Sequence, residues 1–360
     1  MKKFEPVENV ENNTSNISGS GRMSFMALYT KLYNENFEEL EKLREKERKT
    51  GIIIFVCIFS FVLCGILCPF LLPLMAIAMF VAIIVIVVKA FSNNKHNLVE
   101  MKNIKASSYV SDKEDVILVK DNMSMKVLKK DSYSAVFKEK IIKPIIQNIH
   151  PECEYIWYKG MDRYEYKKGE WESFELYDSE DQITVPVNIV GYADVKSELV
   201  MSEVHTQNEH TDSDGDTHRT TLFHGLAGYI KLPKDIGTYI KVKRDAIKFF
   251  GGSKQRVNMD MSEFEKIFDV ESGDKIKAMQ ILTADVMTEM INMIQTTKVK
   301  FEFYINHDMM YVRFHTGELF EPSIFGKSMQ YDKLKKYFDI TENVIKIAED
   351  ICNKIMSVEV

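Results

Sequence analysis

The longest hydrophobic pattern is an apolar run from Gly51 to Val88 that contains no charged residue. A straight helix of this length would reach roughly 57 Å, about twice the thickness of a bilayer core. Pro69 and Pro73 interrupt the run, and we expect the chain to fold back there. The pattern predicts a transmembrane helical hairpin over residues 51–90. The hairpin either crosses the bilayer twice or dips into it and returns.

Basic residues flank this run on both sides. They are Lys42, Arg44, Lys46, Arg48 and Lys49 before it, and Lys89, Lys95, Lys102 and Lys105 after it. Because positive charge collects on the cytoplasmic side of membrane proteins, both flanks are expected there. We therefore predict a multi-pass protein of the cell membrane whose N- and C-termini are cytoplasmic.

A helical pattern precedes the apolar run. Apolar residues recur every three to five positions among charged ones, at Leu28, Leu32, Phe37, Leu40 and Leu43. This spacing predicts an amphipathic cytoplasmic helix over residues 24–50. Its apolar stripe is expected to pack on the soluble domain, with a partner helix as the alternative. Residues 1–23 are rich in Asn, Ser, Glu and Gly, which predicts a disordered tail.

The part after the hairpin mixes helical and alternating patterns. Residues 91–130 predict a linker with a possible strand at 116–119. Over residues 131–360 the spacing predicts helices at 131–149, 262–268, 284–296 and 332–356. It predicts strands at 195–201, 222–232, 298–305 and 310–314. Leu222 and Leu226 are expected on one face of the second strand, and a turn at 306–308 is expected to join the last two strands into a hairpin. Because no regular βαβ rhythm appears, we predict an α+β soluble domain. It has a mainly antiparallel sheet with flanking helices and is attached to the N-terminal transmembrane helical hairpin.

Charge and cysteine content narrow the possible functions. The net charge is −6 and the pI is about 5.9. This argues against a nucleic-acid-binding protein, which needs a concentrated basic surface. The five cysteines show no paired spacing, as is typical of a reducing compartment, and they predict neither a disulfide framework nor a structural zinc site.

The best candidate for chemistry is a loop between two predicted strands. It gathers side chains that suit a divalent metal, namely His205, His210, Asp212, Asp214, Asp216 and His218. Their spacing matches neither a complete EF-hand nor the H-E-x-x-H motif, so a solvated loop without an ion is the alternative. His224 lies at an apolar-facing position and is expected to be a hydrogen-bonded core residue. The sequence predicts no catalytic residue and no organic cofactor.

Several short stretches resemble a known family. They are Tyr133-x-x-x-Phe137-Lys138, then residues 202–206 (SEVHT), 221–226 (TLFHGL), 263–270 (EFEKIFDV) and 278–283 (AMQILT). In this order they resemble the bacterial membrane-anchored proteins grouped as domain of unknown function 3137. The resemblance extends over about residues 25–315, although Met279-Gln280 departs from the Arg-Tyr expected before the Ile-Leu-Thr step. It implies the architecture only, because it brings no catalytic residue with it.

These patterns lead to two hypotheses about function. The first is a non-enzymatic binding or scaffold protein at the cytoplasmic membrane face. Its expected partners are the lipid bilayer and an unidentified membrane or cytoplasmic protein, without nucleic acid, and it could form oligomers. The alternative is a metal-dependent hydrolase or metal sensor that uses the loop 205–218.

Overall fold

The computed structural model describes residues 22–67, 109–112, 116–120, 125–192, 194–244 and 255–358. The helices are α1 (Phe25–Leu67), α3 (Tyr133–Phe137), the π-helical turn η2 (Lys138–Ile142), α4 (Lys143–Ile149), α5 (Arg163–Lys167), α6 (Ser262–Glu265), α7 (Lys275–Ile281), α8 (Ala284–Thr297) and α9 (Tyr331–Ser357). A small sheet contains β1 (Tyr109–Asp112), β2 (Val116–Lys120) and β3 (Met125–Lys129). The large sheet contains β4 (Glu154–Ile156), β5 (Leu176–Val187), β6 (Ser197–Thr211), β7 (Thr217–Lys231), β8 (Tyr239–Arg244), β9 (Arg256–Val257), β10 (Phe268–Ser272), β11 (Phe301–Asn306) and β12 (Met309–Phe314).

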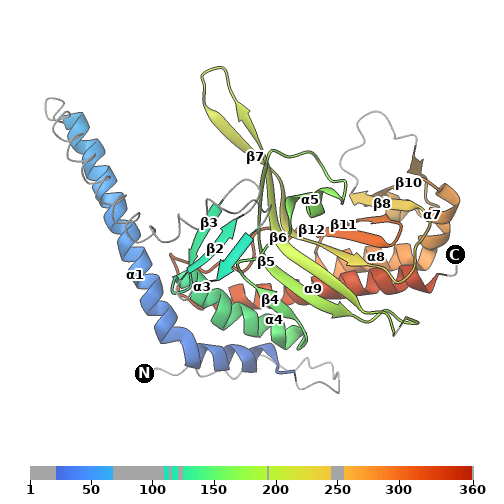
Figure 1. The fold of residues 1–360 in the computed structure, drawn as a ribbon, viewed down its shortest axis with the longest axis horizontal. Helices are drawn as coiled ribbons and strands as arrows, with labels where there is room; N and C mark the ends of the chain where they lie inside the picture. The colour runs from blue at the N-terminus through green and yellow to red at the C-terminus, as the bar shows by residue number, and fades with distance from the viewer. Residues whose placement is uncertain are drawn as a thin grey trace.

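The large sheet is antiparallel throughout, in the order β4-β5-β6-β7-β12-β11-β8-β10-β9. The hairpin β11–β12 therefore lies between β7 and β8, which precede it in the chain. β6 and β7 are the longest strands, and their hairpin projects from the body of the molecule (Figure 1). The predicted α+β class with a mainly antiparallel sheet and flanking helices is confirmed.

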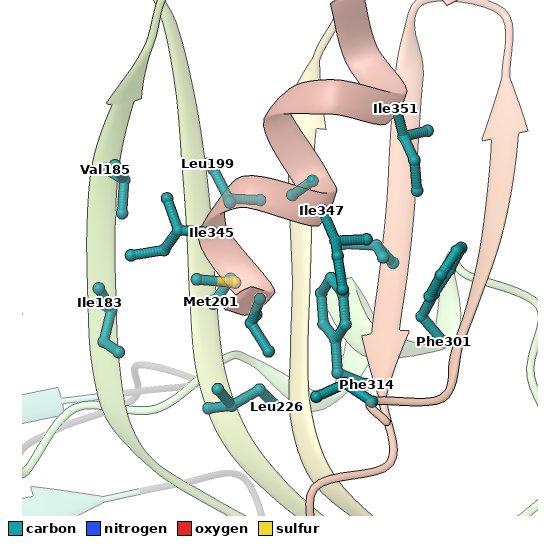
Figure 2. Packing of buried hydrophobic residues seen from close by; sticks show 14 of the residues in the cluster. Ile183, Val185, Leu199, Met201, Leu226, Phe301, Phe314, Ile345, Ile347 and Ile351 are labelled. Atoms are coloured by element: carbon teal, nitrogen blue, oxygen red, sulfur yellow. The ribbon is translucent and has the colours of Figure 1, made fainter. Parts of the chain in front are cut away.

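The main core lies between one face of this sheet and α9. Apolar residues of α9 recur at helical spacing, so one side of the helix is buried along its length. Figure 2 shows Ile345, Ile347 and Ile351 of α9 against side chains from β5, β6, β7, β11 and β12. Burying one such side chain contributes roughly 1.5–3 kcal/mol, so the packing against α9 is a main source of stability.

The opposite face carries a smaller aromatic cluster. Tyr166 on α5 and Phe174 lie over Phe223 of β7. A register shift in the β6–β7 pairing makes Leu222 an extra residue in its strand. Leu222 therefore packs against this cluster and not on the face of Leu226, where the alternation had placed it. The prediction that these two leucines share a face is wrong for that reason.

α1 is one continuous helix whose two halves have different surroundings. Its first half packs on the domain through Phe25, Leu28, Tyr29, Leu32 and Leu40, all buried, and Phe25 contacts Phe338 of α9. The apolar stripe of this half therefore lies against the domain of the same chain, while the helix itself runs on to Leu67. The second half leads away from the body (Figure 1). Its large apolar side chains are 51% to 68% exposed; they are Ile52, Ile53, Ile54, Phe55, Val56, Ile58, Phe59 and Val62.

Within the described ranges, no helix is both long and apolar enough to cross a membrane. The membrane-spanning hairpin therefore stays a prediction. Its second half, residues 68–90, lies outside the described residues, as do most of the predicted tail (residues 1–21) and residues 91–108 of the predicted linker.

Most other predicted elements are present with shifted ends. β2 covers the strand expected in the linker, where β1 and β3 flank it. α6 ends at Glu265 because Phe268 already begins β10, so the helix predicted over 262–268 is shorter. The helix predicted over 131–149 is divided into α3, η2 and α4, with Pro144 in the first turn of α4. Proline is tolerated there because that position needs no donor.

Candidate functional site

The predicted metal-binding residues lie along the β6–β7 hairpin. The strands run further than expected, so the loop shrinks to residues 212–216. At the tip, Asp212 Oδ1 accepts hydrogen bonds from the backbone N–H groups of Asp214 and Asp216, and Asp212 Oδ2 lies 3.3 Å from His218 Nε2. His210 is the strand partner of His218.

His205, another of the six predicted metal ligands, lies away from the tip. His205 is further down the hairpin, where its ring stacks on His224 with centroids 4.3 Å apart, and its Nε2 lies 3.0 Å from Thr221 Oγ1. The structure thus brings Asp212 and His218 together and places His205 with a different group of side chains. The metal-binding role of the six residues stays a prediction.

A buried charged cluster lies between η2 and the sheet. Lys138 is 2% exposed and Asp181 is fully buried. Lys138 Nζ lies 2.8 Å from Asp181 Oδ2, 2.5 Å from Glu321 Oε1 and 3.5 Å from Glu180 Oε1. The carboxylate oxygens of these three acids lie within 4.8 Å of one another, close enough to share one cation. The Lys138 ammonium group lies among these oxygens and supplies positive charge there.

The backbone is irregular on both sides of this ion cluster. Lys138 begins the π-helical turn η2, a feature often found at functional sites. Asp181 lies at a bulge of β5 and has a left-handed φ of 57°. Aspartate is one of the few residues that tolerate this conformation. Both irregularities direct a charged side chain inward, toward an apolar face.

Burial and charge set the protonation of the cluster. Burial lowers the pKa of Lys138, but the charges of Asp181, Glu180 and Glu321 outweigh it and raise this pKa above its ordinary value. Burial raises the pKa of Asp181 to about 7, although Lys138 opposes it. Tyr155 donates a hydrogen bond to Asp181 Oδ1, and burial raises the pKa of Tyr155 well above its ordinary value. Lys138 is therefore charged at neutral pH, and the Tyr155 hydroxyl keeps its proton.

Glu203 connects this cluster to the histidines. Its Oε2 accepts the Leu319 N–H at 3.0 Å, and its Oε1 lies 3.1 Å from His224 Nε2. Burial, together with the charge of Asp181, raises the pKa of Glu203 to about 9. Burial and the neighbouring His205 lower the pKa of His224. Both shifts favour a neutral pair, in which protonated Glu203 donates its hydrogen to His224 Nε2.

A second ion cluster occupies the opposite face of the sheet. Arg313 Nε donates to Glu302 Oε2 at 2.6 Å, and the Arg244 N–H donates to Glu302 Oε1 at 3.0 Å. Burial would raise the pKa of Glu302, but the nearby His315 ring, 3.7 Å away, and the charge of Arg313 lower it to about 2. Arg313 also lies over the Trp171 ring, with its guanidinium carbon 4.6 Å from the centroid. Glu302 is therefore ionised while Glu203 is not, although both are buried in the same sheet.

A groove of about 820 Å³ lies beside α3, α4 and β4. Trp157 and Tyr158 line it together with Tyr155, which therefore connects the groove to Asp181. The lining also carries both signs of charge: Lys130, Lys140, Lys143, Glu139, Glu152 and Glu154. β4 forms one wall and is an edge strand of the large sheet. Such a mixed lining next to a sheet edge can accommodate an extended peptide.

Comparison with known protein families tests the resemblance that the sequence suggested. A family model described as "Protein of unknown function (DUF3137)" matches residues 221–352. The predicted resemblance is confirmed over this region, which runs from within β7 to α9. It includes His224 and Glu321 but neither Lys138 nor Glu203. No curated protein and no solved structure shows a significant similarity to the chain.

Sequence reasoning missed the ion cluster, although two signals indicated it. Lys138 stands three residues before Ile141 and seven before Ile145, on the apolar stripe of its predicted helix. Glu203 continues the inward alternation of Leu199 and Met201. A charged residue at an inward position is costly unless it is paired, so each of these residues implied a buried partner.

Proposed function

We propose that this protein is a membrane-anchored binding or scaffold protein whose α+β domain is held beside the bilayer by α1. The observation that supports the proposal most strongly is the change of surroundings along α1. The same helix is buried against α9 at Phe25 and exposes a row of large apolar side chains beyond Gly51. A patch of this kind marks a surface that is covered by lipid or protein. Basic residues immediately before it favour the bilayer, as positive charge does at the cytoplasmic interface.

Extraction from cell membranes tests the anchor. The complete chain should remain in the membrane pellet after washing with high salt and with alkaline carbonate. A variant lacking residues 51–90 should move to the supernatant while keeping its secondary structure. Recovery of the complete chain in the carbonate supernatant would contradict the proposal.

We propose further that the groove beside β4 binds an extended segment of a protein partner. Trp157 and Tyr158 supply apolar contacts, and Lys140 and Lys143 of the lining supply charge. A tethered domain searches only a thin layer beside the membrane, which raises its effective concentration toward membrane partners. In this proposal the role is non-enzymatic: the domain holds a partner and performs no reaction on it.

Site-specific photo-crosslinking in cells tests the groove. Gln147 lies on its lining, and a photoreactive amino acid there should give a defined covalent adduct with a partner. Gln295, an exposed glutamine of α8, is the matched control site and should give none. Tyr158→Ala should abolish the Gln147 adduct. Equal adducts from both sites, or none from Gln147 in membranes that hold the protein, would refute the groove as the binding site.

A second proposal, a metal-dependent hydrolase or metal sensor, rests on the hairpin tip. Asp212 and His218 are in contact there, with His210 as the strand partner of His218. Calorimetry with Zn²⁺, Mn²⁺ and Ca²⁺ should then show binding that is lost when Asp212 and His218 are replaced by Ala. Replacing Asp235 and His307, which form a similar exposed pair 3.0 Å apart, is the matched control. Unchanged affinity in the Asp212 variant would remove this proposal.

A further inference from the structure

The loop over residues 322–328 carries an apolar side chain that packing does not explain. Phe325 is 89% exposed, and its neighbour Ile324 is 41% exposed. Scattered single exposures are common on protein surfaces, but two adjacent ones at the tip of one loop form a patch.

Hydrogen bonds fix this loop on both sides of its tip. Arg44 Nη1 of α1 donates to the Ile324 carbonyl at 3.0 Å, and the Ser328 N–H donates to Glu41 Oε2 at 3.1 Å. Tyr133 Oη of α3 donates to the Ser323 carbonyl at 3.2 Å. Arg44 is itself buried and paired with Glu41. The loop is therefore attached to α1, and Phe325 is presented at a defined place along that helix.

That place lies close to the exposed apolar half of α1. Arg44 precedes Gly51 by seven residues, which is roughly 10 Å along the helix axis. The headgroup layer extends roughly 5–8 Å outside the hydrocarbon core. A bilayer that covers α1 from Gly51 onward therefore brings its headgroups to within a few ångströms of the level of Arg44. Lys327 of the loop carries positive charge near this level, as does Lys49 of α1, whose ammonium group lies 3.7 Å from Glu45; such charge suits anionic lipids.

We propose that the loop 322–328 is a second lipid contact, in which Phe325 inserts into the interfacial layer beside α1. This inference rests on the proposed membrane anchoring. Aromatic side chains are favoured at the membrane interface. Two contacts, α1 and the loop, would fix the rotation of the domain about α1, which a single helix leaves free. The occupant of this patch is therefore a bilayer that contains anionic lipid.

Depth-dependent fluorescence quenching tests the proposal on the complete chain. The protein is reconstituted into vesicles of phosphatidylcholine and phosphatidylglycerol, with and without lipids brominated near the headgroup. Phe325→Trp adds a fluorophore at the loop tip. Ile276→Trp is the matched control, because Ile276 is 72% exposed on α7, at the other end of the molecule from α1 (Figure 1). The signal of the unmodified chain, which contains Trp157 and Trp171, is subtracted from both.

The fluorescence added by Phe325→Trp should fall at least twofold with brominated lipid, and that of Ile276→Trp should not change. Equal quenching of the two variants in vesicles that hold the protein would overturn the loop contact and leave the anchor standing. A blue shift at Phe325→Trp without quenching would also overturn it, since a protein surface would then cover the patch. Failure of the unmodified chain to float with vesicles would overturn the anchor itself.

Discussion

Replacing Glu203 by Gln should flatten the pH dependence of stability above neutral pH. Glu203 keeps its proton in the folded state, where its pKa is raised to about 9 from an ordinary value of 4.5. Its contribution to stability is therefore complete below about pH 4.5 and is lost as the pH rises through 9. Gln resembles the protonated acid, because it can accept the Leu319 N–H and donate to His224.

The size of this pH dependence follows from Glu203, which binds one proton in the folded state and none in the unfolded state. Each pH unit in this range then costs about 1.4 kcal/mol of unfolding free energy. Between pH 6.5 and 8.5 the unmodified protein should lose roughly 2.5 kcal/mol more than the Gln variant. His224 is present in both proteins, so the proton that an unfolded histidine partly binds near pH 6.5 contributes to both curves and largely cancels in the difference.

Urea unfolding followed by circular dichroism in detergent, at pH 6.5, 7.5 and 8.5, measures this difference. Glu302→Gln is the matched control. Because the pKa of Glu302 is lowered to about 2, its contribution is complete above pH 4.5. Its removal should lower the whole curve by roughly 2–4 kcal/mol without changing the slope. Parallel curves for the unmodified protein and Glu203→Gln would refute the protonated state of Glu203.

Three further substitutions test the packing. Lys138→Met leaves Asp181 without its cation and should lower the unfolding free energy by about 3–5 kcal/mol. The control Lys140→Met, which removes a half-exposed ion pair, should lower it by under about 1 kcal/mol. Equal losses would contradict a buried ion cluster. Ile347→Ala should lower stability by about 2–5 kcal/mol through the cavity it leaves under α9, as measured by urea unfolding. Gly225→Ala should lower the melting temperature, because its Cβ would lie 2.1 Å from the Phe314 carbonyl oxygen; an unchanged melting temperature would show that the strands can separate freely.

Periodicity predicted the elements that are buried on one side. α9 and α8 were predicted to within a few residues, because their apolar spacing repeats over several turns. The β11–β12 hairpin was also predicted, since its strands alternate around the turn residues 306–308. In the structure the turn residue His307 adopts a left-handed φ of 59°. The local hydrophobic pattern is therefore sufficient to predict a helix or strand when one of its faces packs against a single core.

The candidate site was less accessible to such reasoning because it depends on contacts between distant segments. Lys138 and Asp181 are 43 residues apart and meet only through a π-helical turn and a strand bulge. Neither irregularity changes the hydrophobic pattern. The hairpin tip, by contrast, was a candidate because it is rich in His and Asp. In the structure, His205 lies away from this tip, beside His224.

The position of β11–β12 inside the large sheet has a consequence for biosynthesis. β7 and β8 cannot flank their final neighbours until residues 301–314 have left the ribosome (Figure 1). Until then both strands carry unpaired edges, which are prone to association with other chains. Contacts between segments so far apart also slow folding. Nascent chains of this protein should therefore depend on chaperones until synthesis is nearly finished, and truncation before residue 301 should give aggregates, with no smaller folded domain.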